Sequence, residues 1–200
     1  MREILERQGV STVEKTSLET AVDFVVINTC TVTADADKEN KYWIRRARRE
    51  HPAARIVVTG CGVEKNRAEI EALPEVDLVL ANHEKINIAS RLLESCASPA
   101  EQDAAVIEPA PRINPKHLYT PLSISRSEGK SRAFVKIQDG CNHACSFCKV
   151  VMVRGRSRSR ELNDVLDEVK RLADSGYKEI VFAGIQLGAY GLDFSQARAT

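Results

Sequence analysis

Short apolar runs recur along the first half of the chain and alternate with segments of helical periodicity. The apolar runs are 23–28, 54–60 and 76–82, and the helical segments are 35–50, 66–73 and 84–94. Such alternation is typical of a parallel sheet whose strands are connected by crossover helices. We therefore expect an α/β fold in which residues 1–95 form a three-layer domain around a parallel sheet.

One more strand, helix and strand are predicted near the end of the chain, at 132–138, 161–174 and 179–184. The helix carries its apolar residues on one face, and Gly176 is a typical helix stop. Together these elements make one βαβ unit. Because its two strands need neighbours on both sides, we expect residues 131–200 to be the beginning of a larger domain and the chain to be a fragment.

The middle of the chain has a different composition. Residues 95–130 hold five of the seven prolines and show no hydrophobic period. This pattern is typical of a linker or an extended crossing segment. We therefore divide the chain into a first domain, 1–95, a linker, 96–130, and a second domain, 131–200.

Composition and charge narrow the function classes. The chain is 43% hydrophobic and 28% charged, and we find no membrane span and no secretory signal in it. We expect a cytoplasmic protein with reduced thiols. The net charge is only +1, yet 38–55 and 130–160 are strongly basic. Two basic zones in a neutral chain favour a polyanion partner, although the first could be a solvated helix face.

The candidate chemistry centres on three of the six cysteines, Cys141, Cys145 and Cys148. They follow a predicted strand directly, at the carboxyl end of a βα unit, where α/β folds place their chemistry. Zinc would need a fourth ligand, and His143 is too close to Cys141 to complete a tetrahedral site. A 4Fe-4S cluster accepts three thiolates and leaves one iron open. The spacing favours the cluster, with zinc and unligated reduced thiols as alternatives.

These motifs resemble a known family. "GCNHACSFC" is similar to the signature of radical S-adenosylmethionine (SAM) enzymes, and "INTCTVTADADK", "VVTGC" and "RGRSRSR" resemble the methylthiotransferases. "NTCTVTADAD" is most similar to the branch that acts on threonylcarbamoyladenosine in tRNA. The resemblance implies that 1–95 is the methylthiotransferase N-terminal domain without its first strand and first cysteine. It also implies that 131–200 is part of a radical SAM (β/α) barrel.

The resemblance implies cofactors and site residues for the second domain. Cys141, Cys145 and Cys148 would hold a 4Fe-4S cluster whose open iron binds SAM. An electron donor would then be needed to cleave SAM and start transfer of a methylthio group to tRNA, with the chemistry carried by the cofactors rather than by a catalytic side chain. The residues expected to bind SAM are Phe147, Gly184 and Gln186.

Two further cysteines, Cys30 and Cys61, each follow a predicted parallel strand. Both thiols should therefore lie at the same edge of one sheet. The resemblance implies that they ligate an auxiliary 4Fe-4S cluster, which would make two clusters in the complete architecture. Its third cysteine would precede residue 1. Zinc binding and simple burial are the alternatives for two thiols alone.

The run "RGRSRSR" places four arginines at alternate positions, Arg154, Arg156, Arg158 and Arg160. On an extended backbone several guanidiniums would point to one surface beside the cluster and bind RNA phosphates. The alternative is pairing with a cofactor carboxylate or with acidic residues of the barrel. Basic residues of the helix predicted at 35–50 are a second candidate for RNA contact.

Two functions from different classes follow. The first is a tRNA methylthiotransferase, here expected to be an incomplete and inactive fragment. The second is a non-catalytic iron–sulfur or zinc module that binds nucleic acid through its arginines. The two functions differ in whether SAM is bound and cleaved.

Overall fold

The computed structural model describes residues 1–13, 21–31, 33–97 and 132–194. The chain divides into two compact units, Met1–Arg112 and Ile113–Thr200. Except for its first two residues, the predicted linker at 96–130 lies outside the described residues, so its character stays a prediction.

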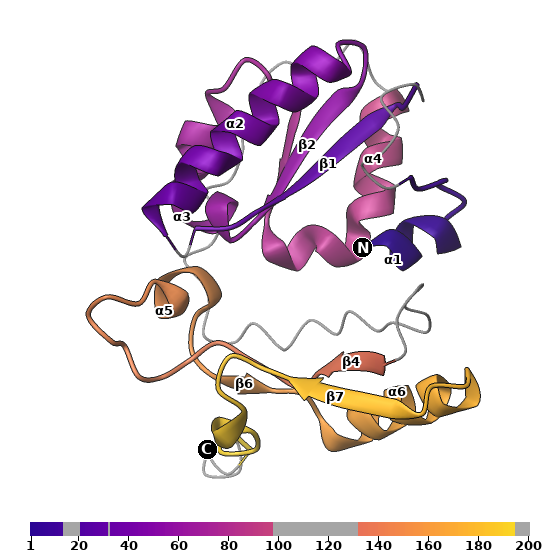
Figure 1. The fold of residues 1–200 in the computed structure, drawn as a ribbon, viewed down its shortest axis with the longest axis vertical. Coiled ribbons are helices and arrows are strands. Elements are labelled where there is room, and N and C mark those ends of the chain that lie inside the picture. The colour runs from indigo at the N-terminus through magenta and orange to yellow at the C-terminus, as the bar shows by residue number, and fades with distance from the viewer. Residues whose placement is uncertain (14–20, 32, 98–131, 195–200) are drawn as a thin grey trace. The chain divides into compact units, whose positions relative to one another are not determined.

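A parallel three-stranded sheet forms the centre of the first unit (Figure 1). Its strands, in sheet order, are β1 (Phe24–Thr29), β2 (Arg55–Gly60) and β3 (Leu78–Leu80). Val26 pairs with Val57, and Val58 pairs with Val79. The parallel sheet expected from the sequence is thereby confirmed, with β2 as its central strand.

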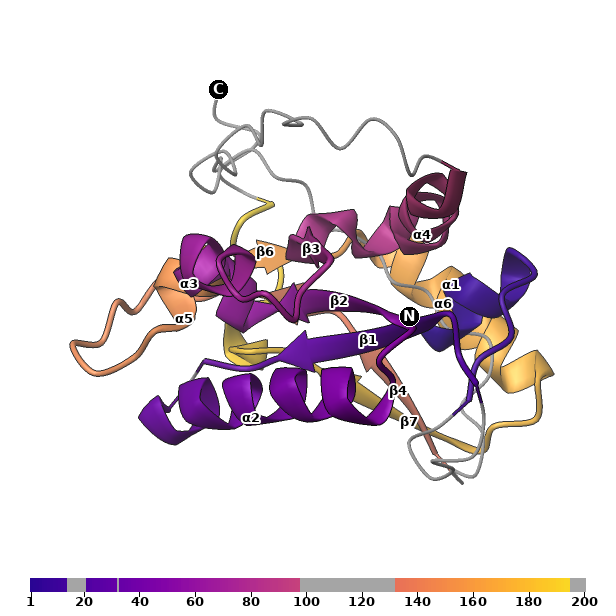
Figure 2. The ribbon, with the colours of Figure 1, turned by 90° about the horizontal axis from the view of Figure 1, so that it is seen from above.

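Helices cover both faces of this sheet (Figure 1). On one face lie α2 (Ala34–Glu50), which runs alongside β1 in Figure 2, and α3 (Cys61–Glu71). On the other face lie α1 (Arg2–Arg7) and α4 (Ile88–Ala97), which follows the 3-10 helix η1 (Asn82–Asn87). The predicted helix at 66–73 therefore begins earlier, at Cys61, and contains a kink at Asn66.

Side chains of β2 alternate between two apolar cores, as the period of a strand requires. Ile56 and Val58 pack with Ile44 of α2 on one face. Val57 packs with Leu92 of α4 on the other. Burial on both faces explains why β2 is a nearly continuous apolar run, and it confirms the three-layer α/β arrangement.

The second unit is built on the predicted strand, helix and strand. β4 (Arg132–Lys136) and β7 (Glu179–Ala183) pair in parallel, and α6 (Leu162–Asp174) connects them (Figure 1). Ala133 and Val135 of β4 pack against Val165 and Leu172 of α6. The apolar face of α6 thus supplies the core of this βαβ unit.

The predicted strand at 132–138 changes its partner at Ile137. Its amide donates to Ala183 of β7, whereas its carbonyl accepts from Arg160. Beyond it, β5 (Gln138–Asp139) pairs antiparallel with β6 (Arg158–Ser159). A short helix, α5 (Val150–Arg154), and a 3-10 turn, η2 (Leu187–Ala189), complete the unit. The strand therefore carries the chain from the sheet into the cysteine loop.

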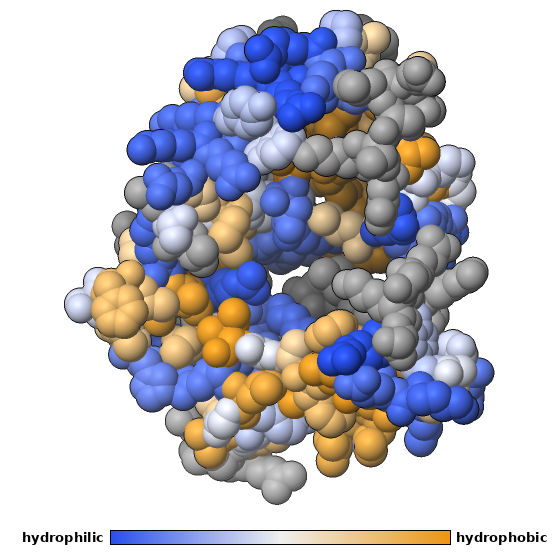
Figure 3. Space-filling model, viewed as in Figure 1, coloured by the Kyte–Doolittle hydropathy of each residue, from blue (hydrophilic) through white to orange (hydrophobic). Residues whose placement is uncertain are grey.

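Large apolar side chains remain exposed on the second unit. Phe134 of β4, Phe182 of β7 and Leu162 of α6 are between 44% and 56% exposed. Figure 3 shows orange, apolar surface over the part of the molecule that these elements form.

Among the described residues, no helix is both long enough and apolar enough to cross a membrane.

Candidate functional site

The three clustered cysteines lie on a loop, residues 140–149, that joins β5 to α5. The loop begins at Gly140, whose φ is +73°. A Cβ there would lie 2.1 Å from the carbonyl oxygen of Arg156, so glycine is required. The next residue, Cys141, donates its amide hydrogen to the carbonyl of Gly155 at 3.1 Å. The first residues of the loop are therefore fixed against the segment that follows α5.

Polar groups surround the Cys141 sulfur. Its Sγ lies 3.4 Å from Oε1 of Gln186 and accepts the amide hydrogen of His143 at 3.4 Å. The Gln186 amide also contacts Nε2 of His143. Cys141 and Gln186, 45 residues apart, are therefore brought together. Gln186, expected to bind SAM, lies beside the cysteine loop, and its binding role stays a prediction.

The other two cysteines lie further along the loop. The Cys148 amide donates to the Cys145 carbonyl at 3.0 Å, which closes a turn. Cys145 is exposed and Cys148 is half-buried. Phe147 between them is 88% exposed, so its side chain packs little against the described chain. Its expected contact with SAM is untested.

The donor set fits an iron–sulfur cluster in its chemistry. The loop offers three thiols that are free of disulfides and accessible or partly accessible, and thiolates are the ligands that iron–sulfur clusters use. In the described part of the chain, no three Cys, His, Asp or Glu side chains already converge as metal ligands. Convergence of the three sulfurs would therefore accompany binding.

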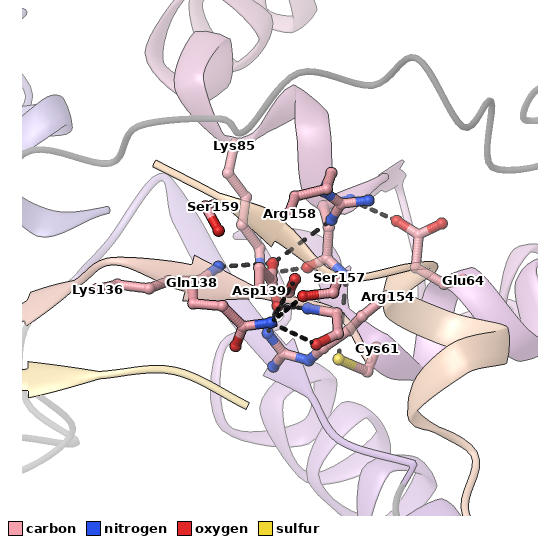
Figure 4. A network of polar contacts seen from close by, with 12 residues as sticks. Cys61, Glu64, Lys85, Lys136, Gln138, Asp139, Arg154, Ser157, Arg158 and Ser159 are labelled. Atoms are coloured by element: carbon pink, nitrogen blue, oxygen red, sulfur yellow. Dashed lines mark hydrogen bonds and ion pairs between the residues drawn. The ribbon is translucent and has the colours of Figure 1, made fainter. Parts of the chain in front are cut away.

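Gln138 connects the loop to its surroundings (Figure 4). Its side chain is fully buried, and its Nε2 lies within 3.0 Å of the Asp139 and Gly140 carbonyls and of the Ser157 hydroxyl. Its Oε1 accepts the amide hydrogen of Gln186 at 2.8 Å. Gln138 was not singled out from the sequence, although a polar residue at the end of the predicted strand at 132–138 could have indicated it.

Asp139, the residue before the cysteine loop, forms ion pairs with three cationic side chains (Figure 4). Its carboxylate lies 2.6 Å from Lys136, 3.1 Å from Arg154 and 3.7 Å from Arg158. Burial alone would raise the pKa of Asp139, but the attraction and hydrogen bonds of Lys136 and Arg154 outweigh it and hold the pKa below its usual range. One carboxylate thus pairs with three cationic side chains at the residue that precedes the cysteine loop.

The four arginines of "RGRSRSR" do not share one surface. Arg154 ends α5 and Arg158 lies in β6, and both pair with Asp139. Arg156 lies between them and is exposed. The run is therefore not extended throughout, because Arg154 belongs to α5 and Gly155 after it has a φ of +77°.

Arg160 differs most from the expectation. Its side chain is 4% exposed and pairs with Glu168 of α6, which is 1% exposed. A second guanidinium nitrogen donates to the Asp164 carbonyl at 3.1 Å. A buried guanidinium with these partners is not presented to a polyanion, so Arg160 is corrected from a candidate RNA contact to a residue of the fold.

Gly184 has a reason of its own to be glycine. A Cβ at this position would lie 2.9 Å from Oε1 of Gln138 and 3.0 Å from Cδ2 of Leu187. The close neighbours at Gly184 are thus the buried Gln138 side chain and Leu187. Packing accounts for the residue, and its expected role in SAM binding stays a prediction.

In the first unit, Cys30 and Cys61 follow β1 and β2 at the same end of the sheet. Thr29 and Gly60, the last residues of β1 and β2, are register partners. Each cysteine directly follows one of these two paired residues. Cys30 is exposed and Cys61 is buried. The structure thus places both at the edge where parallel sheets bind ligands, whereas their ligation is untested.

Three residues that the sequence analysis did not single out support these cysteines. Asn40 accepts from the Cys30 amide at 3.3 Å and donates to the Cys30 carbonyl at 2.6 Å. Asn82 directs its Nδ2 at the Cys61 sulfur at 3.9 Å, and Lys85 holds the Asn82 oxygen at 2.6 Å. The position of Asn82 after the third strand was the available signal.

Two family models match the chain. The first, described as Uncharacterized protein family UPF0004, matches residues 1–81. The second, the Radical SAM superfamily, matches residues 135–189. The two matches fall in the first and the second unit and include all five cysteines discussed above.

Curated relatives extend this similarity across both units. The threonylcarbamoyladenosine tRNA methylthiotransferase MtaB of Bacillus subtilis is 37% identical over 90% of this chain and 39% of its own length. MtaB of Aquifex aeolicus is 39% identical over 90% of this chain and 43% of its own. A tRNA-2-methylthio-N(6)-dimethylallyladenosine synthase of Salinispora arenicola is 36% identical. The chain spans about two fifths of the length of the MtaB relatives.

A solved structure shares the fold. It is the radical SAM methyltransferase TsrM of Kitasatospora setae, with a TM-score of 0.54 and 20% identity, over 82% of this chain and 37% of that one. The family expected from the motifs is thereby confirmed. The two family matches and the named relatives show that this chain belongs to the radical SAM methylthiotransferases, a family of enzymes.

Proposed function

We propose that this chain carries the cofactor sites of a cytoplasmic tRNA methylthiotransferase that modifies threonylcarbamoyladenosine. The observation that carries the proposal is that Cys141, Cys145 and Cys148 lie on one loop after β5, with the Cys141 sulfur 3.4 Å from Gln186. The proposal is supported by the names of the MtaB relatives, which are tRNA methylthiotransferases for this base. The substrate is proposed for the whole protein of which this chain matches a part.

The three thiols of the loop would hold a 4Fe-4S cluster, with SAM on its open iron. When bound, these cofactors supply the one-electron cleavage of the sulfonium from which radical chemistry starts, and an electron donor must reduce them. The chain's own contribution is positioning. The hydrogen bond from the Cys141 amide to the Gly155 carbonyl holds the beginning of the loop, and Gln186 offers an amide beside Cys141.

Cys30 and Cys61 would bind a second cluster at the sheet edge of the first unit. Two thiols do not fill a four-iron cluster, so a further ligand is needed. Asn40 fixes the backbone on which Cys30 stands, and Asn82 donates toward the Cys61 sulfur. Such side chains would hold the cysteines in place around a bound metal.

The tRNA would meet the second unit through the exposed Arg156. Arg156 is exposed and takes part in no ion pair within the described residues, so its guanidinium is available for a phosphate. Arg154 and Arg158 keep Asp139 as a partner and add to the positive field around the loop. The salt-sensitive part of RNA binding should therefore depend on Arg156 first.

Anaerobic reconstitution with iron and sulfide tests this function. The Cys30→Ala/Cys61→Ala chain should bind about four irons and about four sulfides, because the loop cluster remains. Adding Cys145→Ala should abolish this binding. Ser146→Ala in the same loop is the matched control and should change nothing. Binding of zinc with no uptake of iron would instead support the non-catalytic alternative.

A further inference from the structure

We propose that Gln138 is the positioning residue of the cysteine loop. It would hold the start of the loop and the Gln186 segment in one fixed relation, so that the Cys141 sulfur faces the Gln186 side chain. The proposal deepens the proposed function of the loop and rests on it for its purpose. Its geometric content rests on the hydrogen bonds alone.

The orientation of the Gln138 amide follows from its neighbours. Its Nε2 lies 3.0 Å from the Asp139 carbonyl, 2.8 Å from the Gly140 carbonyl and 2.9 Å from the Ser157 hydroxyl. Its Oε1 lies 2.8 Å from the Gln186 amide nitrogen. Two carbonyls require a donor and an N–H requires an acceptor, so only one orientation satisfies both sides. Both ends of the amide are thus used.

These bonds join segments that are distant in sequence. Gly140 directly precedes Cys141, Ser157 lies in the arginine segment, and Gln186 follows β7. Gln138 is fully buried, so water cannot replace its amide when the side chain is shortened or made apolar without a rearrangement. Loss of this amide would leave the Gly140 carbonyl and the Gln186 amide without their common partner.

A second contact confines the Gln138 side chain from the opposite side. The Cα of Gly184 faces it so closely that an added Cβ would lie 2.9 Å from Oε1 and 3.0 Å from Cβ of Gln138. The φ of Gly184 is not in the left-handed region, so alanine is allowed by the backbone and acts through its contacts with Gln138 and with Cδ2 of Leu187 at 3.0 Å. Gly184→Ala is therefore a probe that displaces Gln138 without removing its amide.

The experiment measures alkylation of the unliganded full chain, with each cysteine quantified by mass spectrometry below the unfolding temperature. We expect Gln138→Met, which keeps the length but removes the amide, to raise the rate at Cys141 by roughly tenfold. Cys61 in the first unit should be unchanged. Leu172→Ala, a core substitution at the opposite end of the unit, is the control for stability.

A double-mutant cycle separates positioning from general destabilisation. Gly184→Ala should raise the Cys141 rate in the wild-type background. Its effect should be smaller in a Gln138→Ala background, because the 2.9 Å contact with Oε1 is then absent while the 3.0 Å contacts with Cβ of residue 138 and Cδ2 of Leu187 remain. Iron uptake after reconstitution should decrease in the same variants in which the alkylation rate of Cys141 increases. This second readout fails if the loop holds no cluster, whereas the alkylation rates do not depend on the cluster.

Two results would overturn the proposal. One is an unchanged Cys141 rate in both Gln138→Met and Gly184→Ala. The other is an equal acceleration in Leu172→Ala, normalised to the same drop in melting temperature, because this would make the effect one of stability. Additive effects of Gly184→Ala and Gln138→Ala would likewise contradict the contact on which the proposal depends.

Discussion

The Arg160 guanidinium and the Glu168 carboxylate form a buried ion pair in the second unit, with side chains that are 4% and 1% exposed. Arg160 also holds the Asp164 carbonyl at 3.1 Å, so it anchors the first turn of α6. Only four residues away, Arg156 is exposed. Arginines that are equivalent in the sequence pattern thus have different roles in the structure.

Removing one partner of the buried pair should destabilise the second unit strongly. We expect Arg160→Met to lower the free energy of unfolding by about 3–5 kcal/mol, because it leaves the Glu168 carboxylate buried without its charge partner. Urea unfolding of the second unit measures the change. Arg156→Met, at an exposed position, is the control and should cost less than about 0.5 kcal/mol. Equal losses would show that Arg160 is not buried as described.

The exposed arginine should carry the salt dependence of RNA binding. Arg156→Gln should weaken tRNA binding and lower the slope of log K against log salt by roughly one unit, the value for one phosphate contact. The matched control is Arg132→Gln, which removes an arginine of β4 outside the arginine run. Arg160→Lys cannot serve as the control because it disturbs the fold. A slope that stays the same in Arg156→Gln would remove this residue from the RNA contact.

Gly60, at the junction of β2 and α3, should tolerate no side chain. Gly60 has a φ of +109°, and a Cβ there would lie 2.2 Å from the Thr29 carbonyl oxygen. Gly60→Ala should therefore destabilise the first unit by more than about 3 kcal/mol. Gly9 also has a positive φ but has no atom within 4 Å of an added Cβ, so Gly9→Ala isolates the backbone term of about 1 kcal/mol. Thermal unfolding of the two variants separates the steric clash with Thr29 from the cost of a positive φ.

Asn40 should control the accessibility of Cys30. Its side chain makes hydrogen bonds to both the amide and the carbonyl of Cys30, so Asn40→Ala frees the backbone on which the thiol stands. We expect Cys30 to be alkylated several-fold faster while Cys145 in the second unit is unchanged. Asn66→Ala, on the neighbouring helix, is the control. An unchanged rate at Cys30 would mean that these bonds do not position it.

Much of the fold follows from local patterns. Apolar runs at β1 and β2 could be assigned because both faces of a parallel sheet are buried. The apolar face of α6 predicted the helix because Val165 and Leu172 pack on β4. By contrast, the short pair of β5 and β6 depends on contacts between residues about twenty positions apart, which a local pattern does not contain.

The candidate site was predictable in its thiols and unpredictable in its supports. Spacing in the sequence brings Cys141, Cys145 and Cys148 into one loop. The bonds of Gln138 to Ser157 and Gln186 span 19 and 48 residues, and they exist only because β5 lies beside β6 and near the end of β7. The burial of Arg160 likewise depends on α6, so its sequence neighbours could not reveal it.

The central claim is that Cys141, Cys145 and Cys148 hold a cluster with an open site for SAM. Electron paramagnetic resonance of the reduced, reconstituted Cys30→Ala/Cys61→Ala chain tests it most directly, because only the loop cluster can then give a signal. We predict a 4Fe-4S signal whose shape changes when SAM is added and which is lost in a further Cys145→Ala variant. A signal whose shape is unchanged by SAM, or one that is retained in the Cys145→Ala variant, would contradict the account.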